Sequence, residues 1–188
     1  MAQSAGRRPA TDRHNPRVAL VVSRYNASVT DRLRDGALAQ YAERFPRTPE
    51  PGIVLIDAPG AFELPALALG AASTGRFEGV VALGCLIKGE TSHDRYIAQA
   101  VAQGLVQVTI ATGIPVAFGV LTVDTPQQAR ERAGGKHGNK GQEAMSALLD
   151  TIDQLRILKG VGAARGAALK PQIRDKARSS AAPKRGRA

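Results

Sequence analysis

Val80-Val81-Ala82-Leu83-Gly84-Cys85-Leu86-Ile87, followed by Lys88-Gly89-Glu90-Thr91-Ser92-His93, is the stretch of sequence that decides the fold. Its apolar run predicts a strand that is buried on both faces of a parallel sheet. In open parallel sheets, ligands bind outside the carboxyl ends of the strands, where the next helix presents unpaired backbone N–H groups. The turn after the strand combines a cation, hydroxyl groups and an imidazole at this edge. It is therefore the first candidate for a chemical site.

Strands and helices alternate along the rest of the chain. Further apolar runs predict strands over 17–23, 53–58 and 115–121. Helical spacing of apolar residues predicts a first helix capped by Ser28 or Thr30, and later helices over 61–72, 94–112, 127–132 and from about 139 or 140 to about 158. Such alternation implies parallel pairing with right-handed crossovers. The predicted fold class is α/β, a three-layer α/β/α sandwich around a four-stranded parallel sheet of the flavodoxin-like type.

The positive charge of the chain is concentrated at its two ends. The net charge is +10, but residues 18–158 carry about −1, and the excess of Lys and Arg falls in 1–17 and 159–188. We therefore expect a flexible basic arm over 1–16, one folded domain over 17–158 and a disordered basic tail over 159–188. No apolar stretch predicts a membrane span or a secretory signal, so a soluble cytoplasmic protein is expected.

Cys85 is the only cysteine, which excludes an internal disulfide. Because it lies within the apolar strand, we interpret it as a small buried hydrophobic residue rather than a reactive thiol.

The segment Leu83 to His93 resembles the LG-x-x-I-[RK]-G-x-T-x-H segment of the 6,7-dimethyl-8-ribityllumazine synthase family. Other motifs occur in the order of that family, and together they cover most of residues 18–158. They are the aromatic–Asn pair Tyr25-Asn26, the PGA-x-E-[IL]-P-like segment 59–65, the FG-[IVL]-[LV]-T-like segment 118–122, the QA-x-x-R-[AS]-G-like segment 128–134, and the NKG triplet 139–141.

The resemblance implies an enzyme of riboflavin biosynthesis with the lumazine synthase fold. Such a transferase condenses 5-amino-6-(D-ribitylamino)uracil with 3,4-dihydroxy-2-butanone 4-phosphate, releases phosphate and water, and forms 6,7-dimethyl-8-ribityllumazine in the penultimate step of the pathway. The family needs no metal and no organic cofactor.

The resemblance also assigns roles to individual residues. His93 is the expected catalytic residue, because imidazole exchanges protons near neutral pH. The ribitylaminouracil is expected to contact Tyr25, Asn26, Ala61, Phe62, Glu63, Cys85, Leu86, Ile87 and Phe118. The butanone phosphate is expected to contact Gly89, Glu90, Thr91, Arg132 and Lys140, with Arg132 from this or a neighbouring subunit. Asp94 orients the imidazole or caps the helix, and the sequence does not decide between these roles.

Family members form pentamers with sites at subunit interfaces, and twelve pentamers can close into an icosahedral 60-subunit shell. The short turn over 134–141 resembles that of shell-forming members, so we favour the shell. Riboflavin synthase is a further partner that the resemblance suggests. For the basic tail we favour a solubilising role over attraction of RNA.

Three other interpretations stay open from the sequence. The first is a flavodoxin-like module that binds a flavin or nucleotide without catalysis. The second is a riboflavin synthase of the archaeal type, against which the turn 89–93 argues. The third is a nucleic-acid-binding protein, which the near-neutral central region and the absence of aromatic residues among the basic ones disfavour.

Overall fold

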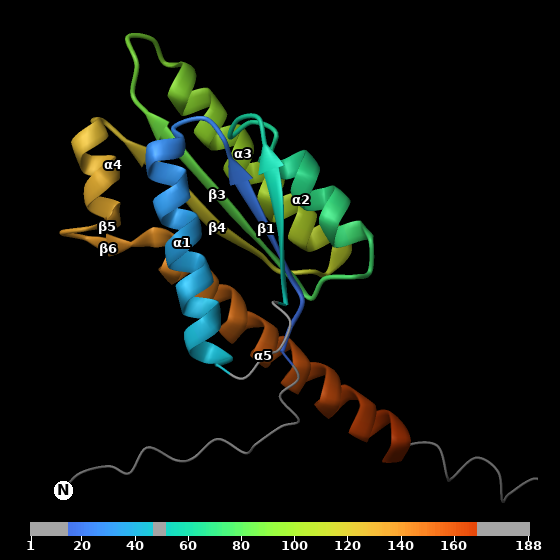
Figure 1. Ribbon diagram of the computed structural model, residues 1–188. Helices are drawn as coiled ribbons and strands as arrows, with labels where there is room; N and C mark the ends of the chain where they lie inside the picture. The colour runs from blue at the N-terminus through green and yellow to red at the C-terminus, as the bar shows by residue number, and fades with distance from the viewer. Residues whose placement is uncertain (1–14, 47–51, 169–188) are drawn as a thin grey trace, which may run out of the picture. The chain divides into compact units, whose positions relative to one another are not determined.

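A computed structural model describes residues 15–46 and 52–168 of the chain, with side chains described up to Gly160. The elements in order are β1 (Val18–Ser23), α1 (Ala27–Arg44), β2 (Ile53–Ala58), α2 (Leu64–Ser73), β3 (Gly79–Ile87), α3 (His93–Thr112), β4 (Val116–Val123), α4 (Pro126–Arg132), β5 (Ala133–Gly135), β6 (Gly138–Asn139) and α5 (Lys140–Ala168). Four strands form one parallel sheet in the order β2-β1-β3-β4 (Figure 1). The predicted α/β class and the four parallel strands are confirmed.

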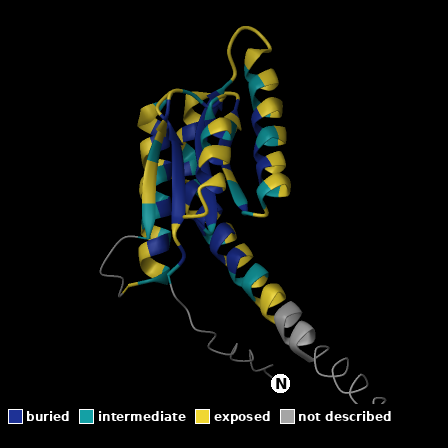
Figure 2. Ribbon diagram, turned by 90° about the vertical axis from the view of Figure 1, so that its right-hand side faces the viewer, coloured by how far each residue is buried: buried dark blue, intermediate teal, exposed yellow. Residues whose placement is uncertain are grey.

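Successive side chains along each strand point to opposite faces of the sheet, and they contribute to two separate apolar clusters, one on each face. On one face, strand residues such as Leu20 and Leu83 pack with α1 and with α5 up to Ile152. On the other face, Val21 and Ala82 pack with α2 and α3. The central strands are accordingly buried along their length (Figure 2). Helices thus cover both faces, which gives the three layers expected from the sequence.

The start of α1 differs from the prediction. The helix begins at Ala27, so neither Ser28 nor Thr30 is its cap. Asn26 occupies the N-cap position in the left-handed conformation, with φ 62°, and makes no side-chain bond to the helix. Asparagine is one of the few residues with a side chain that tolerate this conformation. The prediction failed because it assumed an extended cap residue.

A short hairpin occupies the segment that was predicted to be only a turn. Strands β5 and β6 pair in antiparallel fashion, with Gly134 at φ 96° and Gly138 at φ 73°. Both angles lie where glycine is favoured. The strands are too short to give a periodic pattern, which is why the sequence did not reveal them.

The hairpin leads directly into the contact between α1 and α5. Asn139 donates from Nδ2 to the carbonyl oxygen of Arg32 at 2.8 Å, and its Oδ1 accepts from the backbone N–H groups of Gly141 at 2.9 Å and Gln142 at 3.2 Å. A Cβ atom at Gly141 would overlap the carbonyl group of Leu33. The NKG triplet therefore caps one helix and brings its first turn against the backbone of another.

The last helix is longer than predicted. It extends to Ala168 instead of ending near Leu158, because residues 160–168 contain four alanines and no proline to stop the helix, although three glycines disfavour it. The predicted tail 159–188 thus overlaps α5, and residues 169–188 and most of the predicted arm 1–16 lie outside the described residues. The chain divides after Ile152 into two units. Across 15–46 and 52–168, no helix combines the length and apolar character that a membrane span requires.

Candidate active site

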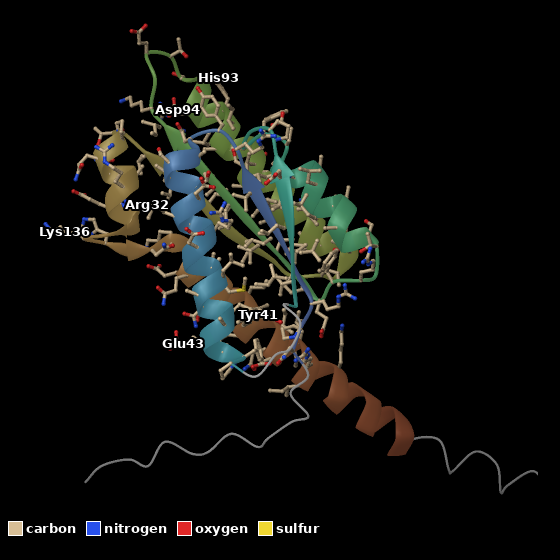
Figure 3. The ribbon with its side chains drawn as sticks, viewed as in Figure 1. Arg32, Tyr41, Glu43, His93, Asp94 and Lys136 are labelled. Carbon is tan, nitrogen blue, oxygen red and sulfur yellow. The ribbon has the colours of Figure 1, made fainter. Side chains whose placement is uncertain are left out.

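The carboxyl ends of the parallel strands lie at one edge of the sheet, and the turn after β3 begins there. Lys88 donates its backbone N–H to the Val123 carbonyl at 2.9 Å, which fixes the start of the turn against the end of β4. The turn then leads to His93, the first residue of α3. Figure 3 shows His93 and Asp94 at this helix start, at the end of the sheet to which the strands run. The turn lies where a parallel sheet places its ligands.

Most of the predicted uracil-binding residues line one cavity, which we call the aromatic cavity. Its volume is about 580 Å³. Its predicted lining residues are Tyr25, Asn26, Ala61, Phe62, Glu63, Cys85, Leu86, Ile87, Gly89, Thr91 and His93, and Gly60, Asp94 and Ile97 complete it. The Tyr25 and Phe62 side chains are 70% and 61% exposed although they line a cavity. Two accessible aromatic faces suit a flat heterocycle.

A second cavity of about 550 Å³ adjoins the turn on its other side, and we call it the charged cavity. It is lined by Lys88, Gly89, Glu90, Thr91, Ser92, Asp94, Arg95, Thr122, Val123, Asp124, Gln128 and Arg132. Most of the predicted phosphate-binding residues meet here, including Arg132, whose Nη1 donates to the Gln128 carbonyl at 3.2 Å. The lining contains both cations and carboxylates, so it is polar but not uniformly positive.

Phe118 and Lys140 are not brought to either cavity. They line a third one, the edge cavity, of about 460 Å³, beside the free edge of β4, and Arg132 lines it as well. The Lys140 ammonium is paired with the Glu143 carboxylate at 2.6 Å. Phe118 is 47% exposed. Within one chain, the predicted set is therefore divided between two sides of the site, with Arg132 at the boundary.

Asn26 holds the end of β1 to β3. Its Nδ2 donates to the Cys85 carbonyl oxygen at 2.9 Å. The paired register of β1 and β3 ends at Val22 and Leu83, so β3 extends beyond the last residue that pairs with β1. From Cys85 to Ile87, one side of the β3 backbone thus faces the aromatic cavity instead of a strand, and the Asn26 amide occupies one of its acceptors.

Substitutions at Asn26 separate the hydrogen bond from the backbone conformation. We expect Asn26→Gly to lower the free energy of unfolding by about 1 kcal/mol, because it removes the bond but accepts the positive φ. Asn26→Ala should cost about 2 kcal/mol, since it also strains the backbone. Denaturant titration at one fixed protein concentration measures both. If both variants lost the same free energy of unfolding, the left-handed conformation would not destabilise alanine at this position.

Cys85 is buried, as predicted, with 1% of its side chain exposed. Burial raises the pKa of the thiol from 9.0 to about 11, because the thiolate loses its hydration. At neutral pH the group is therefore protonated and a poor nucleophile.

The raised pKa makes a testable contribution to stability. The unfolded chain loses the thiol proton near pH 9 and the folded chain near pH 11, so this contribution is complete below pH 9 and is lost as the pH rises toward 11. We expect the free energy of unfolding to fall over this interval by up to about 2 kcal/mol more in the native protein than in Cys85→Ala. Denaturation at pH 8 to 11 measures the difference, and parallel curves would contradict it.

Several lining residues were not predicted from the sequence. Asp124 and Gln128 follow β4, and the Asp124 backbone N–H donates to Gln128 Oε1 at 2.9 Å. Thr125 caps α4 by accepting from the Gln128 N–H at 3.2 Å. The signal that could have found them is the Asp-Thr-Pro sequence directly after a predicted strand, since polar residues at strand ends line such sites. Among the described residues, no group of three or more His, Cys, Asp or Glu side chains is arranged to hold a metal ion.

The fold and the site define a class of protein: a flavodoxin-like three-layer α/β protein with cavities at the carboxyl ends of its parallel strands. A comparison with protein families identifies the family within this class. The sequence model of the 6,7-dimethyl-8-ribityllumazine synthase family matches residues 15–156, and the chain belongs to this family. Membership indicates lumazine synthase activity in riboflavin biosynthesis.

Proposed function

We propose that the protein condenses 5-amino-6-(D-ribitylamino)uracil with 3,4-dihydroxy-2-butanone 4-phosphate to give 6,7-dimethyl-8-ribityllumazine, with release of phosphate and water. One observation carries this proposal: residues from four separate segments of the chain line the aromatic cavity, at the turn that also borders the charged cavity. A ligand with a flat ring and a ligand with a phosphate can therefore bind side by side in adjoining cavities.

The aromatic cavity is the proposed site of the uracil. Tyr25 or Phe62 stacks on the ring, since both side chains are accessible. The free side of the β3 backbone from Cys85 to Ile87 then pairs with the alternating donors and acceptors of the heterocycle, as an added strand would. Glu63, at the start of α2, accepts from hydroxyl groups of the ribityl chain.

The charged cavity is the proposed site of the phosphate. Backbone N–H groups of Gly89, Glu90 and Thr91 precede α3, where the helix dipole favours an anion. The Arg132 guanidinium lines the same cavity and can pair with two phosphate oxygens. The Glu90 carboxylate would repel the phosphate, so its side chain must turn toward solvent, where the residue is exposed.

His93 is the proposed proton carrier, since it is exposed and lines the aromatic cavity beside the uracil. The 5-amino group attacks the ketone carbonyl, and the nitrogen loses a proton as water leaves to form an imine. The hydroxyl-bearing carbon then loses its proton, a C=C bond forms and the C–O bond to phosphate breaks. The resulting enol tautomerises to a ketone, and attack of the ribitylamino nitrogen on this carbonyl closes the ring and releases a further water. Imidazole can accept and return the protons of these steps. Holding both substrates together removes a further part of the barrier.

The edge cavity suggests that neighbouring subunits complete the site. Phe118 on the edge strand β4 is half exposed, and Val106 and Ile110 on α3 are 57% and 69% exposed, which leaves apolar surface for a second copy to cover. We propose a pentamer with sites between subunits, in which Phe118 of one copy meets the aromatic cavity of the next and Lys140 meets its charged cavity, and twelve pentamers in a shell. Sedimentation velocity distinguishes free pentamers from the shell.

The direct test mixes the purified protein with both proposed substrates and follows lumazine fluorescence. Product should form only when both substrates and native protein are present, without added metal or cofactor. A flavin-binding module would instead change the fluorescence of added flavin and form no lumazine. A riboflavin synthase would consume lumazine and form riboflavin. Either result would replace the proposed reaction.

A further inference from the structure

Asp94 carries a buried carboxylate oxygen that has no partner. It is the second residue of α3, and its Oδ1 is buried without a hydrogen bond among the residues that the structure describes. An unsatisfied buried acceptor destabilises a fold, and an ionised one does so more than a neutral one. The residue as a whole is only partly buried and lines two cavities, so a rotation of its side chain would bring this oxygen to a donor on a ligand.

The position of Asp94 indicates where that ligand donor would lie. Asp94 lines both the aromatic and the charged cavity, and it shares this property only with Gly89 and Thr91. Within 15–46 and 52–160, it is thus the only ionisable side chain common to the two cavities. His93 before it lines the aromatic cavity alone, and Arg95 after it lines the charged cavity alone, because successive helical side chains point in different directions.

We propose that Asp94 accepts a hydrogen bond from a hydroxyl group of the four-carbon ketone phosphate. The inference rests on the proposed function. With the phosphate in the charged cavity and the uracil in the aromatic cavity, the carbon chain of the ketone crosses the boundary where Asp94 lies. The phosphate itself is excluded as the partner, since two anions repel each other. Asp94 thereby selects a hydroxylated ketone phosphate and holds its carbonyl toward the amine.

Equilibrium binding tests the contact without requiring turnover. In titration calorimetry with the full chain, Asp94→Asn should weaken binding of 3,4-dihydroxy-2-butanone 4-phosphate by about 10-fold, because a neutral amide oxygen is a weaker acceptor than a carboxylate. Binding of inorganic phosphate should stay equal or become tighter, since no phosphate contact is lost. The matched control is Asp35→Asn, the same change on the exposed face of α1, outside the three cavities; it should alter neither affinity.

Kinetics and stability separate this role from a structural one. In Asp94→Asn, the KM for the ketone phosphate should rise about 10-fold while that for the uracil changes less than about 2-fold. The free energy of unfolding should stay the same or rise, because no protein partner is lost.

Three results would overturn the inference: unchanged affinity for the ketone phosphate, a rise confined to the KM of the uracil, or equal weakening of ketone phosphate and inorganic phosphate together with lower stability. Absence of lumazine from the wild-type assay would refute the proposed reaction instead, and the calorimetric comparison would still decide whether Asp94 contacts the ketone.

Discussion

Replacing Gly141 with alanine is expected to lower the free energy of unfolding by about 3 kcal/mol or more. The added Cβ would overlap the carbonyl group of Leu33 in α1, which is backbone and cannot move aside as a flexible side chain could. The helices would have to separate, which would break the Asn139 bond to the Arg32 carbonyl at 2.8 Å and loosen the core beneath. Overpacked sites cost about 1–3 kcal/mol, and occasionally more where nothing can yield.

Gly70 provides the matched control for this substitution. It lies in α2, and a Cβ there would meet no atom within 4 Å. Gly70→Ala should therefore raise the free energy of unfolding by about 0.5–1 kcal/mol, the usual gain for alanine over glycine in a helix. Denaturant midpoints of both variants at the same protein concentration make the comparison. If Gly141→Ala behaved like Gly70→Ala, the close contact between α1 and α5 would not exist in solution.

Replacing His93 with alanine is expected to lower kcat by about 10- to 100-fold while the fold is retained. The side chain is exposed at the helix start and has no hydrogen bond among those described, so its loss removes no packing. General acid–base groups contribute on this scale or above it, and positioning of the two substrates would sustain the remaining rate. Steady-state lumazine formation gives kcat, and circular dichroism checks the fold.

His137 is the control histidine. It lies in the turn between β5 and β6, its Nε2 is 3.8 Å from a Glu131 carboxylate oxygen, and it lines none of the three cavities. His137→Ala should leave kcat within about 2-fold of wild type. An unchanged kcat in His93→Ala would remove this imidazole from the proton transfers, and the condensation would then depend on positioning alone.

The sheet was predictable because each central strand is a continuous apolar run. Residues such as Leu20, Val81 and Leu83 are fully buried, and runs of this kind have few alternatives to a strand covered on both faces. The start of α1 was not predictable, since Asn26 adopts a left-handed conformation there and its side chain bonds to Cys85, which is distant in sequence. The role of Gly141 was hidden for the same reason: its constraint comes from the backbone of another helix.

The motifs selected residues that line the cavities, but they did not predict how these residues divide between the cavities. Tyr25, Phe62 and His93 come from separate segments and line the aromatic cavity. Phe118 belongs to the same sheet but lines the edge cavity instead. Strand order decides this, because β4 lies at the edge beyond β3, and no local pattern encodes strand order. Asp94 could be placed at the helix start from sequence, but its unpartnered oxygen is a property of the folded surroundings.

Because β3 extends past β1, much of the proposed selectivity for the heterocycle would depend on main-chain groups. Side-chain substitutions do not remove these groups. From Cys85 to Ile87, the groups that would face the heterocycle are amides and carbonyls of the main chain. Exchanges at Leu86 or Ile87 that preserve the strand would leave them in place, so family members could diverge there without changing the base they accept. Amide-to-ester replacement by chemical synthesis would reveal the contribution that side-chain scanning misses.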